Sequence, residues 1–504
     1  MKIYKKYIAF LLRNIKLPQK LLKGSLLYWS TFSIIVVLLF LICLEVWSIL
    51  FQTFTSEITG NLTKRAIIFP SIAIILGVTF LLISYITKRY KLSQRYLLII
   101  ILLFSFIIRL VWIIAIPTQP NSDFQVYHQM AMSIVSGKMP SPSKPLGYPL
   151  ILSIAYFISP NPISGRILNV ILGVITVFLV YTAGKLLGGE TAGLFAASWM
   201  AISPSEIFMS SVLGTEVVTS TFVFASLSLG IYYFRKEKVN SLIPLVTGLI
   251  LGIAVVIRPT SILYVILLAG LIWFKNKDKN RLKLLLSLFG GLSIILVFII
   301  GWQSINAKKL SVQSLFYDSY PLLSGTNIGN NGRYNLDDVK LYYSWPPDQR
   351  NIKVFNTAVN RLTNLSLNQF IYFIGEKMRY YLADNRYGSL WAFYTVKLPL
   401  SNQQLFSLLK WIDVISQSWY FLAIIGTALT TLITGFKKYP FFYILVVFFV
   451  LTSIPYIFFE VQPRYHHVVL PVISLACGIL PGYIAELLTS PHNISLALKN
   501  FLSS

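Results

Sequence analysis

Residues 96–127 read YLLIIILLFSFIIRLVWIIAIPTQPNSDFQVY, an apolar run that ends in a polar turn. The run from Tyr96 to Ile116 is long enough to cross a hydrocarbon core of about 30 Å as a helix. Similar runs fill the 504-residue chain, which is 56% hydrophobic and only 12% charged, with a mean hydropathy of +0.70. These values lie far above those of soluble domains and exclude a soluble or disordered protein. The sequence therefore predicts an all-α polytopic membrane protein.

Twelve apolar runs are predicted to span the membrane. They cover approximately residues 26–50, 66–86, 96–116, 167–187, 191–209, 215–234, 241–257, 261–274, 284–302, 414–435, 441–459 and 467–487. The stretch 148–160 is too short to span and is bracketed by prolines, which predicts an interfacial or re-entrant helix.

The basic residues predict the orientation of these spans. Lys and Arg number 43 against 17 Asp and Glu, a net charge of +26. In a soluble protein this excess would suggest nucleic acid, but in a bilayer protein it marks cytoplasmic loops, so no nucleic-acid partner is expected. Both termini are predicted to be cytoplasmic, with residues 2–23 as a basic amphipathic stretch on anionic lipid and no cleaved signal peptide. A prokaryotic plasma membrane is the expected location.

The spans divide the chain into four predicted parts. Residues 1–95 hold the basic stretch and two spans, residues 96–302 a transmembrane core, residues 303–413 an extracytoplasmic loop domain, and residues 414–504 the last spans. Two outer segments, 117–166 and 303–413, are much longer than the other connections. Long loops carry function more often than short ones, so the site is sought on the outer face.

Several kinds of chemistry are not supported by the sequence. Cys43 and Cys477 both lie in apolar runs, which argues against a disulfide framework or a thiolate metal site. No Walker A, HExxH or dinucleotide fingerprint is present. The adjacent His466 and His467 lack a nearby carboxylate or cysteine cluster that would complete a ligand set. Neither a cofactor nor a metal is therefore expected.

Acids are scarce, and most fall on the predicted outer side. Asp123 is the only acid between Glu57 and Glu190, and it follows the span quoted above. A lone loop aspartate is commonly a solvated acid or a helix N-cap. At a membrane surface where a hydroxyl acceptor meets a lipid-borne donor, the same carboxylate can act as a general base.

Three further charged residues lie at predicted outer span ends. Glu216 begins a span, where it either interacts with the helix dipole or lines a watery cavity. Arg258 either snorkels to the interface or binds a phosphate partner, and Arg464 could hold an anionic headgroup. Arg109 lies inside a span and needs a partner there, for which Glu45 is one possibility.

Together these residues resemble a known family, the GT-C glycosyltransferases, and most closely the bacterial relatives of protein O-mannosyltransferases and of the lipid A aminoarabinose transferase. The resemblance covers roughly residues 96–475. It is carried by Arg109, Asp123, Tyr127, Ala131, Gly137, Gly147-Tyr148-Pro149, Arg166-Ile167-Leu168-Asn169, Pro204, Glu216, Arg258-Pro259-Thr260, Arg464-Tyr465 and Pro471. Two departures stand out: the first two spans are an addition, and Phe124 replaces the second acid of the eukaryotic Asp-Glu pair.

The resemblance implies transfer of a sugar from a polyprenyl-phosphate donor at the outer face, with inversion. Asp123 would be the general base. Donor phosphate would be held by Arg258, Arg464 and Arg166, and the site would be supported by Glu216, Tyr127, Tyr148 and Tyr465. The acceptor would be a protein, a cell-wall polymer or a glycolipid. Aromatic residues of the loop 303–413, such as Trp391, would stack on sugars or belong to an interfacial belt.

Two other functions remain open from the sequence. Twelve spans with both ends inside are also typical of a transporter or a lipid-linked sugar flippase. Charges are rare at mid-membrane depth, however, and no matching pair of interrupted helices is visible in two halves. A polysaccharide polymerase or ligase would differ mainly in its acceptor.

Overall fold

The computed structural model describes residues 93–140, 144–236, 240–275, 280–307, 319–438, 448–449 and 452–489. This part of the chain consists of helices and turns without a strand, which confirms the predicted all-α class. The helices up to residue 307 are α5 (Gln94–Ala115), α6 (Ser122–Val135), α7 (Gly147–Ile158), α8 (Pro162–Ala201), α9 (Pro204–Met209), α10 (Thr215–Arg235), α11 (Leu242–Ile257), α12 (Ile262–Lys275) and α13 (Asn280–Ala307). The later helices are α14 (Tyr320–Gly325), α15 (Leu336–Ser344), α16 (Arg350–Thr363), α17 (Leu367–Leu382), α18 (Tyr387–Phe393), α19 (Asn402–Lys438) and α21 (Leu470–Thr489). Short 3-10 helices are η1 (Pro259–Ser261), η3 (Ile328–Asn330), η4 (Ile454–Ile457) and η5 (Pro463–Val469).

Five described helices are long and apolar enough to cross a membrane, namely those in α5, α8, α10, α13 and α19. Helix α7, helix α11 and the segment Pro259–Lys275 are shorter apolar helices. The count of twelve spans is therefore not confirmed. The basic stretch 2–23, the first two predicted spans and most of 441–459 lie outside the described residues.

Helix α8 contains a sharp turn at Gly189, where φ is 84° and ψ is 178°. Only glycine adopts this conformation readily, because a Cβ would be strained there. On either side of the turn, the Tyr181 hydroxyl donates to Glu190, and Lys185 forms an ion pair with the same carboxylate. These contacts fold the second arm of α8 back beside the first. The first arm contains the predicted span 167–187, whereas the second arm ends at Ala201, before the end of the predicted span 191–209.

Arg109 is fully buried in α5, and its guanidinium faces the end of α8. Nη1 donates to Ser105 Oγ at 2.6 Å and to the Ala201 carbonyl at 3.1 Å, and Nη2 donates to the Met200 carbonyl at 3.4 Å. The last carbonyls of a helix carry partial negative charge and lack partners within the helix. Arg109 thus finds its partner at a helix end, whereas Glu45 lies outside the described residues.

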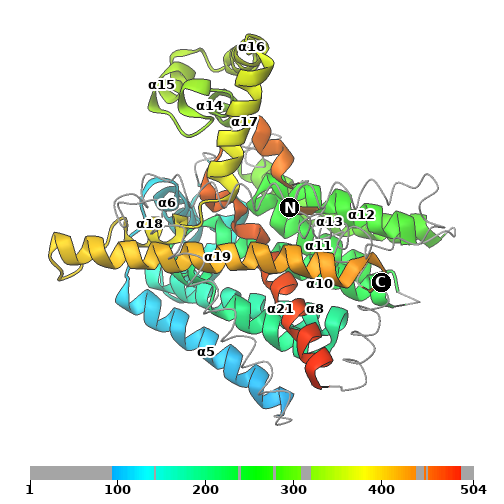
Figure 1. Cartoon of the computed structure of the whole chain (residues 1–504). Coiled ribbons are helices and arrows are strands. Elements are labelled where there is room, and N and C mark those ends of the chain that lie inside the picture. The colour runs from blue at the N-terminus through cyan, green and yellow to red at the C-terminus, as the bar shows by residue number, and fades with distance from the viewer. Residues whose placement is uncertain are drawn as a thin grey trace.

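Helix α8 packs against α5, α10 and α21 (Figure 1). The main core is formed by buried side chains from α8, α10, α11, α12, α13, α17, α19 and α21, and partly buried residues of α5 pack against it. Within this core the rings of Trp199 and Trp419 stack with their centroids 5.4 Å apart. Helix α5 instead leaves apolar residues such as Ile100 and Leu103 exposed, as expected of a helix that faces lipid.

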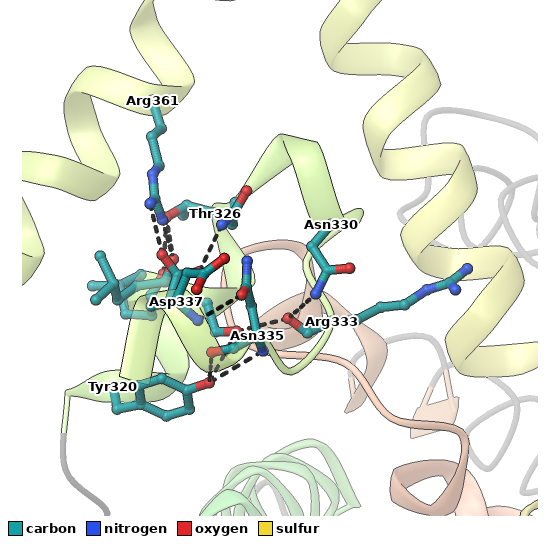
Figure 2. A network of polar contacts seen from close by, with 12 residues as sticks. Tyr320, Thr326, Asn330, Arg333, Asn335, Asp337 and Arg361 are labelled. Atoms are coloured by element: carbon teal, nitrogen blue, oxygen red, sulfur yellow. Dashed lines mark hydrogen bonds and ion pairs between the residues drawn. The ribbon is translucent and has the colours of Figure 1, made fainter. Parts of the chain in front are cut away.

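Helices α14, α15 and α16 stand away from the bundle at the far end of α17 (Figure 1). We call residues 319–363 the cap. Its small core contains Leu323, Tyr342 and Val354, and a polar network holds its turns together (Figure 2). In that network the Arg361 guanidinium donates to Asp338 at 2.8 Å and to the Leu323 carbonyl at 2.6 Å. The cap lies within the predicted loop domain 303–413, but α19 begins at Asn402, so that helix runs through position 413.

Candidate functional site

Asp123 lies in the first turn of α6 and forms two ion pairs with residues far apart in the sequence. Lys144 Nζ is 2.8 Å from Oδ1, and Arg464 Nη2 donates to Oδ2 at 3.0 Å. Burial opposes ionisation of this carboxyl, but the charges of Arg464 and Lys144 outweigh it and lower the pKa of Asp123 to about 2. The carboxylate is therefore ionised at neutral pH and held between two cations.

Arg464 also receives support from its own segment. Its Nε donates to Gln462 Oε1 at 2.7 Å, and Gln462 Nε2 donates to Glu460 at 2.6 Å. The guanidinium lies over the rings of Phe124 and Trp391, with 5.2 Å to each centroid. Burial acts against the charged form, but Glu216 and the other neighbouring groups outweigh it and raise the pKa of Arg464.

Glu216 is buried in the first turn of α10, between two arginines. Its Oε1 lies 3.4 Å from Arg258 Nη2 and 3.8 Å from Arg464 Nε. All three side chains are at least nine-tenths buried. A buried carboxylate is stable only when paired, and this one is shared by two cations. Asp123 and Glu216 thus form one cluster with Lys144, Arg258 and Arg464.

Arg258 follows the last residue of α11, and Pro259 prevents the helix from continuing. Its guanidinium lies 4.9 Å from the centroid of the Tyr465 ring. The same ring is 5.6 Å from Arg464. Both guanidinium groups therefore lie near the Tyr465 ring as well as near the Glu216 carboxylate.

Tyr148 and Tyr127 pack edge to face with ring centroids 5.2 Å apart. The Tyr148 hydroxyl is buried and makes no hydrogen bond to any described residue. Gly147 lets this segment approach the end of α11, because a Cβ there would lie 2.4 Å from the Ile257 nitrogen. The Gly147-Tyr148 pair therefore packs directly beside the residue that precedes Arg258.

Arg166 lies apart from this cluster. Its Nη1 donates to the Ile113 carbonyl near the end of α5, at 3.3 Å. No contact joins it to Asp123 or Glu216 among the residues that the structure describes. The rotation of α8 about its axis decides this placement, and a phosphate-binding role for Arg166 stays a prediction without structural support.

Lys144 and Gln462 are site residues that the sequence did not reveal. Lys144 lies in the same loop as Asp123, and its only signal was that few basic residues fall on the predicted outer side. Gln462 had no signal beyond its position two residues before Arg464.

The cap holds the segment that carries Arg464. The main-chain nitrogens of Glu460 and Val461 donate to the carbonyls of Pro321 and Gly332, at 2.7 and 3.0 Å. Lys377, buried in α17, donates to the carbonyls of Gly325, Ile457 and Phe459. Burial lowers the pKa of Lys377 to about 7, although Glu460 acts in the opposite direction. Cap and site are thus joined through residues 457–464.

A cavity of about 880 Å³ opens beside Asp123 and Arg464. It is lined by residues of α6, the cap, α17, α18, α19 and the segment 461–464. Its aromatic walls are formed by Tyr334, Tyr380, Tyr387, Trp391, Tyr394 and Phe406, among others. A cavity of this size, with a carboxylate and an arginine on its wall, can admit a sugar or a similar polar group.

His466 and His467 point into the protein core and make different contacts. His467 Nε2 lies 3.0 Å from Glu206, and its Nδ1 is 2.6 Å from the Tyr387 hydroxyl. His466 Nδ1 is 2.6 Å from the Tyr381 carbonyl, and burial lowers the pKa of this histidine to about 4. Within the described ranges, no group of three or more His, Cys, Asp or Glu residues is arranged to hold a metal ion.

A comparison with protein-family models matches residues 143–302 to the family described as dolichyl-phosphate-mannose-protein mannosyltransferase. This confirms the resemblance to GT-C glycosyltransferases. The matched mannosyltransferase-like stretch contains Lys144, Tyr148, Glu216 and Arg258. Asp123 and Arg464 lie outside it and join the cluster only through the fold. No curated protein matches the sequence.

Solved structures of the oligosaccharyltransferase from Archaeoglobus fulgidus resemble the chain at low sequence identity. The apo form has 13% identity and a TM-score of 0.48, and the alignment covers 82% of this chain and 53% of that one. The complex with Zn and sulfate has 14% identity and a TM-score of 0.48, with 81% and 51% covered. The complex of AglB with an inhibitory peptide and a dolichol-phosphate has 13% identity and a TM-score of 0.46, with 82% and 54% covered. The chain thus spans about half the length of these structures.

Proposed function

We propose that the chain is an inverting glycosyltransferase that moves a sugar from a polyprenyl-phosphate donor to an acceptor hydroxyl, with Asp123 as general base. The observation that carries this proposal is the charge cluster beside the cavity, where Lys144, Arg258 and Arg464 surround Asp123 and Glu216. The match of residues 143–302 to a mannosyltransferase family supports the reaction class.

The charges of the cluster suit a lipid phosphate. Three cations contact two carboxylates directly, which leaves one positive charge in excess. A sugar bound through a polyprenyl monophosphate is a phosphodiester with one negative charge. Arg258 and Arg464 would bind the phosphate oxygens, since a guanidinium presents several donors to such a group. Tyr148, whose hydroxyl has no hydrogen-bond partner among the described residues, would donate to the same phosphate.

In the proposed reaction, the acceptor oxygen attacks the anomeric carbon from the face opposite the phosphate. The bond between the anomeric carbon and the phosphate oxygen breaks, and its electron pair stays on the phosphate. The arginines stabilise this second phosphate charge as it develops. Asp123 takes the hydroxyl proton and later releases it to water. The donor bond supplies the driving energy, so no nucleotide is required.

Donor binding would also make Asp123 a stronger base. In the structure Arg464 and Lys144 hold the pKa of Asp123 at about 2, which is low for a general base. A phosphate that draws these cations toward itself removes their stabilisation of the carboxylate. The pKa of Asp123 then rises, and the base becomes effective only when the donor is present.

Location and partners follow from the sequence and are proposed with the function. The site would face the extracytoplasmic side of a prokaryotic plasma membrane, with both termini in the cytoplasm. The acceptor would be a protein, a cell-wall polymer or a glycolipid that enters through the cavity beneath the cap.

The test is sugar release from a synthetic polyprenyl-phosphate sugar by the purified full-length chain in proteoliposomes. Asp123→Asn keeps the shape of the side chain and should lower the rate by about 10²- to 10⁴-fold. Asp337→Asn, in the exposed first turn of α15, is the matched control and should retain the rate. Equal turnover by wild type and Asp123→Asn would show that the base is another residue. If neither releases sugar and a solute accumulates in the vesicles, the protein is a carrier.

A further inference from the structure

Arg333 lines the cavity, and its guanidinium donates no hydrogen bond to any other described residue. Its Nε is buried without an acceptor. The other arginines on the cavity wall are paired: Arg464 with Asp123 at 3.0 Å, and Arg386 with Asp384 at 2.6 Å. A buried donor without an acceptor is unfavourable unless a ligand or water satisfies it.

The structure holds the Arg333 side chain in a defined place. Its carbonyl accepts hydrogen bonds from Ser324 Oγ at 2.7 Å and from Asn330 Nδ2 at 3.4 Å. Figure 2 shows the side chain extending away from that network. Its guanidinium lies 4.0 Å from the centroid of the Tyr380 ring. An arginine stacked on an aromatic ring loses less freedom when it binds an anion, because its orientation is already set.

The walls around Arg333 favour a carbohydrate ligand. Tyr334 and Tyr380 flank it, and Trp391 and Tyr394 come from α18 and the residue after it. Aromatic faces pack well against the C–H faces of sugars, while a guanidinium selects a carboxylate or a phosphate ester. The combination therefore fits an acidic sugar better than a neutral one.

We propose that Arg333 is a specificity-determining residue that binds a carboxylate or phosphate on a glycan acceptor. The inference rests on the proposed function for the identity of the ligand as an acceptor. It extends that function by assigning a negative charge to the acceptor and by naming Arg333 as the residue that binds this charge.

The experiment measures binding without turnover, by the tryptophan fluorescence of the purified full-length chain. The probes are cellobiose and two derivatives, one with a carboxylate at the C6 position of its terminal sugar and one with a phosphate ester at the same carbon. Wild type should bind at least one charged derivative about tenfold more tightly than cellobiose, as for a charge-assisted hydrogen bond. The derivative that binds more tightly identifies which anion the site prefers.

Arg333→Gln should bind all three probes within about twofold of one another. Arg333→Lys should keep part of the preference, because it keeps the charge. Arg379→Gln is the matched control: Arg379 lies on α17 and pairs with Glu376, and it does not line the cavity. Because Arg333→Gln could alter folding, the preference of wild type is also measured at low and high salt, where screening should reduce it.

Equal binding of all probes by wild type would overturn the inference, and so would an unchanged preference in Arg333→Gln. An acidic peptide is titrated in the same assay, and tighter binding of this peptide than of either charged sugar would contradict the assignment to a glycan. Failure of sugar release with an intact charge preference would refute the proposed function alone. Normal sugar release without any charge preference would refute the proposed role of Arg333 alone.

Discussion

Neutralising Glu216 should destabilise the protein and make it depend on a bound phosphate. Glu216 lies 3.4 Å from Arg258 and 3.8 Å from Arg464, and all three side chains are almost fully buried. Glu216→Gln leaves the two guanidinium groups facing each other without a shared counter-charge. Removing one partner of a buried ion pair typically costs about 3–5 kcal/mol. Because both distances are longer than an ideal pair, we expect about 3 kcal/mol, the lower end of that range.

The assay is thermal unfolding of the full-length chain in detergent, with and without polyprenyl phosphate. Without the lipid, Glu216→Gln should unfold about 3 °C below wild type, because the unfolding entropy of a chain of this length is large. With it, the phosphate takes the place of the lost carboxylate, and the variant should gain more stability than wild type. Glu376→Gln is the control, since Glu376 pairs with Arg379 one turn away and is more exposed. Its loss should be about 0.5 kcal/mol and insensitive to the lipid.

Two results would refute this reasoning. If Glu216→Gln unfolds at the same temperature as wild type, the two arginines do not need a counter-charge, and the cluster is more solvated than the structure shows. If polyprenyl phosphate stabilises both proteins equally, the phosphate binds elsewhere. In that case Arg258 and Arg464 would have only a structural role.

Three further predictions concern Asp123, the cap and α8. Lys144→Gln removes one of the two cations that pair with Asp123 and should raise its pKa from about 2. In a profile of rate against pH, the acid limb should then move to higher pH, and an unmoved limb would exclude the ion pair. Burial lowers the pKa of Lys377 from 10.5 to about 7, so between these pH values the unfolded chain binds more protons than the folded one. The stability of the fold should therefore rise with pH across that window. Lys377→Met should lack this rise, which unfolding temperatures measured against pH would show. Gly189→Ala should lose about 1–3 kcal/mol in denaturant unfolding because φ is 84° there, and an unchanged stability would disprove the turn in α8.

The sequence predicted the residues of the site better than their contacts. Hydropathy and the alternation of spans place the ends of α5 and α11 and the starts of α10 and α21 on one face. This is why Asp123, Glu216, Arg258 and Arg464 could be expected together. Arg166 obeys the same alternation but turns toward Ile113. The rotation of a helix depends on packing, and hydropathy does not specify it.

The fold and the attachment of the cap could not be predicted from the sequence for a different reason. A segment of about a hundred residues without a long apolar run gives no span to orient it. Its attachment depends on main-chain hydrogen bonds and on the close approach of Gly325, where a Cβ would lie 2.2 Å from the Phe458 carbonyl oxygen. Main-chain contacts of this kind require no particular side-chain type, so the sequence contains little pattern that would predict them. The pairing of Lys144 with Asp123 was likewise hidden, because a loop has no periodicity that fixes its contacts.

The attachment of the cap has a mechanistic consequence. Residues 457–464 bond to the cap and to Lys377 at one end and carry Arg464 at the other. Arg333, which we propose to bind the acceptor, follows Gly332, whose carbonyl accepts from Val461 at 3.0 Å. A force on the cap from a bound acceptor would therefore reach Arg464 through a few covalent and hydrogen bonds. Arg464 pairs with Asp123, and we propose that it also binds the donor phosphate. Under the proposed function, this connection would let an acceptor in the cavity adjust how firmly Arg464 holds the catalytic carboxylate.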